Sequence, residues 1–127
     1  MRDNVEMIES LWDAFSRGDL DKVAAGVAEN GEVVFPDNLP WGGVHTGPDG
    51  FRAALDQIRS RYGDYKVKTE MVLGADDDHV VVVARVQGRG KGGKVDSRVA
   101  WIYRVRDGKV MRAEAFPDTA AMLEALG

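Results

Sequence analysis

Cysteine is absent from the 127-residue chain, which excludes disulfides, thiolate nucleophiles and cysteine-based metal sites. Histidine is nearly absent: His45 and His79 stand far apart, so an HExxH metal motif is excluded as well. No apolar run approaches the roughly 20 residues that cross a bilayer, and the opening MRDNVE is unlike a signal peptide. We therefore expect a soluble, cytoplasmic protein with no membrane contact and no metal site.

Positive charge is in deficit, with 17 lysines and arginines against 21 aspartates and glutamates and a formal net charge of −4. Because nucleic-acid binding rests largely on neutralising phosphates with lysine and arginine, this balance argues against a nucleic-acid partner. The apolar share of 44% and the charged share of 30% are those of an ordinary globular protein. With no linker, repeat or low-complexity tract, residues 1–127 are predicted to form one domain around one core.

Apolar residues recur at helical spacing in the first half of the chain. Residues 4–17 are predicted to form a helix that starts at a capping box and ends at Gly18, and Asp19 can cap a short second helix. A third helix is predicted from about Gly47 to Gly63, because a threonine cap, an early proline and an acid precede its apolar stripe.

The second half of the chain has the period of two that is typical of strands. Glu32–Phe35 is predicted as a brief strand that Pro36 ends. Four further strands are predicted in succession, over Tyr65–Leu73, His79–Gln87, Val95–Val105 and Lys109–Phe116. Asp107-Gly108 is a strong hairpin signal, and Asp118 can cap a terminal helix. Helices followed by an antiparallel meander indicate an α+β fold.

The stretch GRGKGG satisfies the pattern GxGxxG, which in dinucleotide-binding proteins links a strand to a helix. Here predicted strands lie on both sides, so no helix N-terminus is available to receive a pyrophosphate. The stretch is interpreted as a flexible hairpin tip, and no cofactor is expected.

The predicted strand HVVVVARVQ is apolar on both faces over Val80–Ala84. A two-sided strand needs a cover on each face, and we expect the helices to supply one and a second subunit to supply the other. The protein is therefore predicted to be a homodimer. Arg85 shares a face with Val81 and Val83. If that face is internal, Arg85 is a buried cation and a catalytic candidate; if it is external, Arg85 is an ordinary surface residue.

The segment VVFPDNLPWGGVHTG gathers an acid, an amide, an indole and an imidazole in one short irregular stretch, which predicts the mouth of a small-molecule pocket. Asp37 and His45 are the candidate general acid–base groups, and the N-terminus of the following helix should keep His45 neutral. Asn38 and Trp41 are predicted to contact the substrate. The alternative is that Asp37 and Asn38 only form a turn and that His45 is a surface residue.

Aromatic residues elsewhere are predicted to complete the substrate-binding wall. Trp101 and Tyr103 share one face of their strand, where their indole N–H and phenol O–H can form hydrogen bonds with a ligand. Phe15 comes from the apolar stripe of the first helix and Phe35 from the end of the short strand. The alternative interpretation, that these residues are core aromatics, is compatible with the first.

The order of elements resembles that of the nuclear transport factor 2-like superfamily. Three stretches are similar to its SnoaL-like polyketide cyclase and ketosteroid isomerase-like branch: FSRGDLDKV, LPWGGVHTGPDGFR and YRVRDGKVMRAEAF. The resemblance implies a cone-shaped barrel of three N-terminal helices wrapped by a curved, mainly antiparallel sheet, with a short C-terminal helix. It also implies an enclosed apolar cavity and, usually, a dimer.

The positions that carry catalysis in a ketosteroid isomerase hold different residues in this chain. Matching without gaps puts Leu11 at the oxyanion-hole tyrosine, Phe35 at the aspartate base and Trp101 at the protonated aspartate. Proton abstraction next to a carbonyl needs a base and donors for the enolate oxygen, and this chain lacks both at those positions. No steroid isomerase activity is expected.

The limonene epoxide hydrolase pattern is matched only in part. Asn38–Pro40 resembles its Asn-Met-Pro, and Arg85–Gln87 resembles its Arg-x-Asp with glutamine in place of the acid. Ala115 stands where both its second aspartate and the acid–base aspartate of the SnoaL-type cyclases would be. Neither hydrolase nor cyclase chemistry is carried over as it stands.

Three functional hypotheses remain. The chain is a cofactor-free acid–base enzyme of isomerase, cyclase, lyase or hydrolase type acting on a small hydrophobic compound, a non-catalytic module that binds such a compound, or a dimeric interaction domain. A cavity filled by Phe35, Trp101 and Tyr103 favours the third, and an open cavity favours the first two.

Overall fold

A computed structural model describes residues 2–91 and 93–126 of the chain. The four helices are α1 (Arg2–Ser16), α2 (Leu20–Ala25), α3 (Gly47–Arg61) and α4 (Thr119–Leu126). The six strands are β1 (Val27–Phe35), β2 (Gly43–Thr46), β3 (Asp64–Gly74), β4 (His79–Gly90), β5 (Gly93–Arg106) and β6 (Lys109–Phe116). The predicted α+β class is confirmed. No helix among these described residues combines the length and the apolar character needed to span a membrane.

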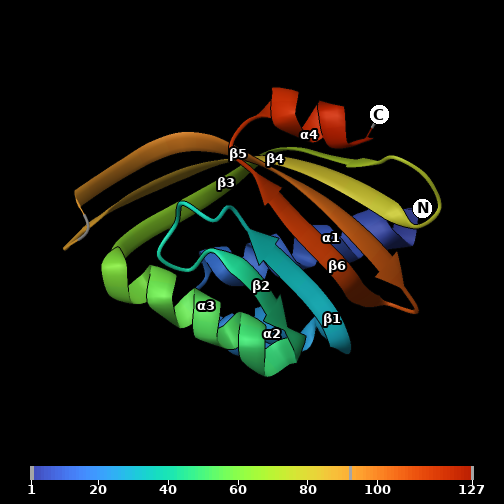
Figure 1. The fold of residues 1–127 in the computed structure, drawn as a ribbon. Coiled ribbons are helices and arrows are strands. Elements are labelled where there is room, and N and C mark those ends of the chain that lie inside the picture. The colour runs from blue at the N-terminus through green and yellow to red at the C-terminus, as the bar shows by residue number, and fades with distance from the viewer. Residues whose placement is uncertain (1, 92, 127) are drawn as a thin grey trace.

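One six-stranded sheet carries the fold, in the order β2-β1-β6-β5-β4-β3. β3, β4, β5 and β6 form the predicted antiparallel meander, and β1 then joins β6 in parallel and β2 in antiparallel fashion. Figure 1 shows the sheet curving around α1, α2 and α3, with α4 on the opposite face. This arrangement leaves the concave face and the three N-terminal helices facing each other.

Two features near the start of the sheet differ from the prediction. β1 begins at Val27 rather than at Glu32, because its register with β6 shifts between these two residues and the strand continues across the ENG stretch. A Cβ on Gly31 would lie 2.6 Å from the carbonyl oxygen of Val110, so the glycine allows the close approach of β6. The four-residue strand β2 was not predicted, since it is too short to show a period of two.

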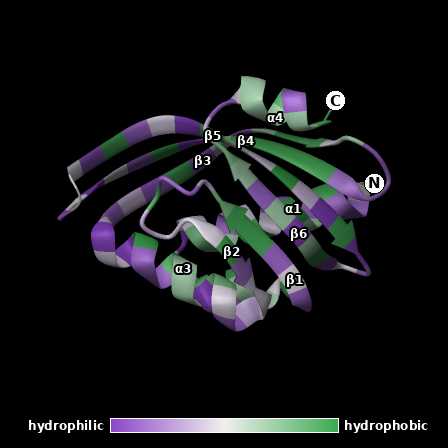
Figure 2. Ribbon diagram, viewed as in Figure 1, coloured by the Kyte–Doolittle hydropathy of each residue, from purple (hydrophilic) through white to green (hydrophobic). Residues whose placement is uncertain are grey.

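The outer face of the sheet is partly covered by the chain itself. Met122 of α4 packs against Val81 and Ala100 in a buried cluster, so the C-terminal helix supplies a cover that was expected from a second subunit. This corrects the argument for the homodimer but does not test the dimer, which stays a prediction. Figure 2 shows hydrophobic residues in α4 above the sheet and a mixture of hydrophilic and hydrophobic residues around α3.

Arg59 joins three elements beneath the concave face. Its Nη2 donates to the carbonyl oxygen of Phe15 at 2.9 Å, and its Nη1 donates to the carbonyl oxygen of Tyr65 at 3.3 Å. The guanidinium also lies 4.9 Å from the centre of the Phe15 ring. A cation is favoured at the end of a helix, where carbonyl groups lack helical partners. Arg59 of α3 therefore fixes the end of α1 and the start of β3, which border the same interior space.

Candidate functional site

A cavity of about 300 Å³ lies between the concave face of the sheet and the N-terminal helices. Leu11 of α1 and Leu55 of α3 line it from the helical side, and Val33, Trp101 and Ala113 line it from the sheet. Its volume is at the lower end of the range of about 300–1,000 Å³ that is typical of small-molecule sites. The fold therefore encloses space for a compact ligand.

Charged side chains are absent from the described residues that line this cavity, which include no aspartate, glutamate, histidine, lysine or arginine. The polar groups that reach it are tyrosine hydroxyls, tryptophan indoles, one serine and one amide. They belong to Trp12, Asn38, Trp41, Tyr62, Tyr65, Ser97, Trp101 and Tyr103. Such a lining provides hydrogen bonds in an apolar space but no counter-charge for an ionised ligand.

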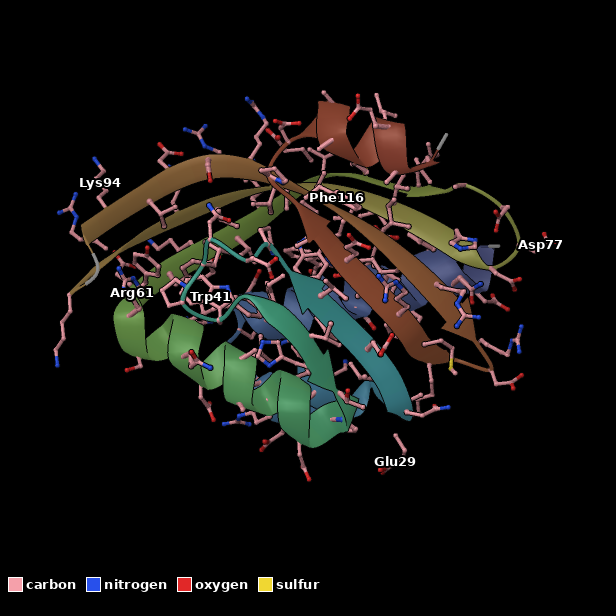
Figure 3. All side chains as sticks on the ribbon, in the orientation of Figure 1. Glu29, Trp41, Arg61, Asp77, Lys94 and Phe116 are labelled. Atoms are coloured by element: carbon pink, nitrogen blue, oxygen red, sulfur yellow. The ribbon has the colours of Figure 1, made fainter. Side chains whose placement is uncertain are left out.

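The predicted mouth segment folds into two successive tight turns. The amide of Leu39 donates to the carbonyl of Pro36 at 3.2 Å, and the amide of Gly42 donates to the carbonyl of Leu39 at 2.9 Å. A Cβ on Gly42 would lie 2.4 Å from the Pro36 oxygen, so only glycine fits where the loop closes on itself. The turns bring Asn38 and Trp41 to the cavity lining, and Figure 3 shows Trp41 in this loop near α3.

The predicted aromatic wall is present. The rings of Phe35 and Trp101 meet edge to face with centroids 5.3 Å apart, and Tyr103 stacks on Trp101 at 5.7 Å. Trp12 of α1 meets the Trp101 ring edge-on at 6.3 Å. These side chains pack against one another along the wall rather than filling the space beside it. The open cavity favours the two small-molecule hypotheses over an interaction domain.

Burial raises the pKa of two cavity tyrosines further above the ordinary value of 10.0. Burial, with a smaller contribution from Tyr62, raises the pKa of Tyr65 to about 12 against the opposing effect of Arg59. Burial also raises the pKa of Tyr103, and the Trp12 indole opposes this rise. Both phenols are therefore hydrogen-bond donors at neutral pH and are poor general bases.

His45 and Asp37 lie near the cavity but outside its lining. His45 pairs with Val33 across β1 and β2, its Nε2–H donates to the carbonyl oxygen of Trp41 at 2.7 Å, and its ring meets the Phe35 ring edge-on at 5.8 Å. Asp37 is exposed in the mouth loop. No hydrogen bond or ion pair joins Asp37 to His45 in residues 2–91 and 93–126, and their acid–base role stays a prediction.

Arg85 is not brought to the cavity. It lies on the outer face of the sheet, where its Nε and Nη2 donate to the two carboxylate oxygens of Asp96 at 3.0 and 3.1 Å. The guanidinium holds the pKa of the Asp96 carboxyl below its ordinary value. The sequence left open whether Arg85 faces the interior or the outside, and the structure places it outside. The prediction of Arg85 as a catalytic residue depended on an internal position and is corrected.

Trp12, Tyr62 and Tyr65 line the cavity although the sequence did not single them out for binding. Trp12 follows Leu11 in the apolar stripe of α1, and Tyr65 occupies an inward position of β3 opposite Gly88. Helical and strand periodicity therefore gave a signal that these side chains face the interior. Phe15, Phe35, Trp101 and Tyr103, which were predicted, line the same cavity.

The positions of the expected family catalysts also fall on this wall. Leu11, Phe35 and Trp101 are each less than a tenth exposed, and they line the cavity together with Ala115. The cavity is thus in the expected place, with apolar groups at all four positions. Within the described residues, no group of three or more histidines, aspartates or glutamates is arranged to hold a metal ion.

Residues 8–113 match the sequence model of the SnoaL-like domain. The uncharacterized protein Rv0034 of Mycobacterium tuberculosis (strain ATCC 25618 / H37Rv) is 30% identical over 120 residues. The match covers 93% of this chain and 92% of that protein. The similarity therefore extends over nearly the whole of both chains.

Solved structures share the fold. An NTF2-like protein from Burkholderia thailandensis E264 superposes with a TM-score of 0.83 at 25% identity, covering 100% of this chain and 99% of that one. TerC, co-crystallised with polyporic acid, superposes with a TM-score of 0.81 at 24% identity, covering 96% of each chain. At this level of identity the likeness concerns the arrangement of the elements.

Proposed function

The chain belongs to the SnoaL-like domain family and has the nuclear transport factor 2-like fold, and from this premise we propose that it binds a small, uncharged, largely apolar molecule in its cavity. The observation that carries the proposal is an interior space of about 300 Å³ whose described lining contains no charged side chain. An ionised ligand would lose its hydration there without gaining a counter-charge. A neutral ligand gains roughly 25 cal/mol for each Å² of apolar surface that it buries.

The relatives support a small-molecule role at the level of the fold. TerC was co-crystallised with polyporic acid, and a structure from Catenulispora acidiphila with a ketosteroid isomerase-like fold is a complex with trimethylamine. Those ligands belong to those proteins. For this chain we propose only the ligand class that its own lining favours, and binding of this kind requires no cofactor, metal or nucleic acid.

Filling the cavity should weaken binding. Ala115 faces the cavity opposite Trp101, so Ala115→Leu places three more carbon atoms in the ligand space. Indane, a small neutral hydrocarbon, should raise the melting temperature of the wild type, because a ligand that binds only the folded state stabilises it. We expect Ala115→Leu to weaken indane binding at least tenfold, about 1.4 kcal/mol.

Ala53→Leu is the matched control, since Ala53 is exposed on α3 and the substitution is the same. Val67→Phe, from the β3 side of the cavity, replaces Ala115→Leu if that variant does not fold. Equal stabilisation of the wild type and both filled variants by indane would refute the proposed site.

A second candidate function, a cofactor-free acid–base enzyme of isomerase, cyclase, lyase or hydrolase type, is favoured by one observation. Because the Trp41 carbonyl accepts a hydrogen bond from His45 Nε2, the neutral imidazole has Nδ1 as its proton acceptor. The ring of His45 lies against Phe35, which lines the cavity. Asp37, in the adjacent loop, would then stabilise the imidazolium.

Hydrogen–deuterium exchange at C2 of 1-indanone distinguishes the two functions. We expect the wild type in D₂O to leave this exchange at the buffer rate, because none of the described residues that line the cavity is a suitable base. Exchange above the buffer rate that is lost in His45→Ala but kept in His79→Ala would establish the enzyme instead. His79 is a fair control because it is the first residue of β4, pairs with Asp76 and is not among the residues that line the cavity.

We also propose that the chain forms a homodimer through the outer face of its sheet. Met71 and Leu73 of β3 and Leu123 and Leu126 of α4 are 38%, 55%, 58% and 44% exposed. Leu73 is paired with Val81, which packs against α4, so β3 and α4 border the same face. Exposed apolar surface of this kind marks interaction sites.

Sedimentation at micromolar concentration should therefore give the mass of a dimer. Leu73→Glu should shift the protein toward the monomer, because the new carboxylate would have to be desolvated in the interface. Val44→Glu, at the opposite edge of the sheet and 57% exposed in the wild type, should remain dimeric. A monomeric wild type under these conditions would end the proposal.

A further inference from the structure

Trp12 brings an unpaired donor to the cavity wall. Its Nε1 atom is buried and has no hydrogen-bond partner among residues 2–91 and 93–126, although the side chain lines the cavity. The indole N–H is a donor only, and a buried donor is almost always paired in a folded protein. We therefore expect a hydrogen-bond acceptor near Trp12 Nε1.

The polar group that lies against this indole is the hydroxyl of Tyr103. Trp12 opposes the effect of burial on the pKa of that hydroxyl as a hydrogen-bond donor would, although Nε1 makes no hydrogen bond of normal geometry within residues 2–91 and 93–126. Trp101 holds both partners, stacking on the Tyr103 ring at 5.7 Å with planes 21° apart and meeting Trp12 at 6.3 Å and 76°. The indole of Trp12 and the phenol of Tyr103 are thus both held by Trp101 at the cavity wall.

We propose that Tyr103, with Trp12 behind it, forms a subsite that donates a hydrogen bond to a carbonyl oxygen of the bound molecule. With the ligand bound, the Trp12 N–H donates to a lone pair of the Tyr103 oxygen, so the phenol's own proton is directed to the ligand. Tyr103 contacts the ligand, and Trp12 is a positioning residue. This inference rests on the proposed function and narrows its ligand class to small neutral ketones and related carbonyl compounds.

A carboxylic acid is a poor occupant of the subsite despite its carbonyl group. At neutral pH it is ionised, and none of the described lining residues is a lysine, arginine or histidine that could balance its charge. Asn38 and Ser97, the amide and the serine of the lining, are exposed. They remain hydrated in the free protein and so select less strongly for an acceptor than a buried phenol does.

Two probes that differ in one carbonyl group test the subsite: 1-indanone and indane. We expect the wild type to bind 1-indanone about fivefold or more tightly than indane, the gain typical of one net hydrogen bond. Tyr103→Phe should reduce this ratio to about one, and Trp12→Phe should reduce it in part. Tyr65→Phe removes a hydroxyl from another part of the same cavity and should change both affinities together, leaving the ratio within about twofold of the wild type.

The indole N–H resonance of Trp12 supplies a readout that a merely structural role would not move. In the wild type it should shift downfield on adding 1-indanone and much less on adding indane, and Tyr103→Phe should remove the difference; this measurement serves even if Trp12→Phe does not fold. An unchanged 1-indanone to indane ratio in Tyr103→Phe would overturn the subsite alone. Failure of both probes to bind the wild type would overturn the proposed function and the subsite with it.

Discussion

The register between β4 and β5 determines which side chains of these strands face the cavity. Val82 is paired with Trp101 on the inner face, while Arg85 is paired with Arg98 on the outer face. Because side chains alternate along a strand, a shift of β5 by one residue would turn Arg98 inward and Trp101 outward. The uncharged lining of the cavity, and with it the proposed ligand class, depends on this register. The Asp107-Gly108 turn, with φ of 52° and 73°, fixes the next hairpin in the same way.

The outer face accommodates its charges in pairs. Arg85 and Arg98 are directly opposite each other, an arrangement that repels, but each guanidinium binds a carboxylate, of Asp96 and of Glu70 respectively. Exposed ion pairs contribute little to stability. Their effect is better understood as specificity, since the pairs form in this register and would be lost in a shifted one. The charged surface and the apolar cavity are thus two consequences of one strand pairing.

Much of the fold was readable from local patterns. The helical stripes, the period of two after residue 65 and the Asp107-Gly108 turn predicted the three N-terminal helices, the meander and its last hairpin. The extension of β1 back to Val27 and its parallel pairing with β6 were not readable, because they depend on Gly31 fitting against a strand that is distant in sequence.

Prediction of the candidate site is limited in the same way, because the site depends on contacts between elements that are distant in sequence. Periodicity places Trp12 and Tyr65 in the interior, but it does not show that space is left beside them, since a cavity depends on how distant elements pack. It likewise could not decide the side of Arg85, because both faces of Val80–Ala84 are apolar and the second cover is the chain's own α4. The aromatic wall was predictable because Trp101 and Tyr103 share one face of β5, while Arg98, Arg104 and Arg106 lie on the other.

The central claim is that the cavity accepts neutral molecules and rejects charge of either sign. The most direct measurement compares the affinities of the wild type for indane, indane-1-carboxylate and the 2-aminoindane cation at neutral pH. With no charged group among the described lining residues, both ions should bind at least about a hundredfold more weakly than indane, a difference of roughly 2.7 kcal/mol. Binding of either ion as tightly as indane would contradict the account.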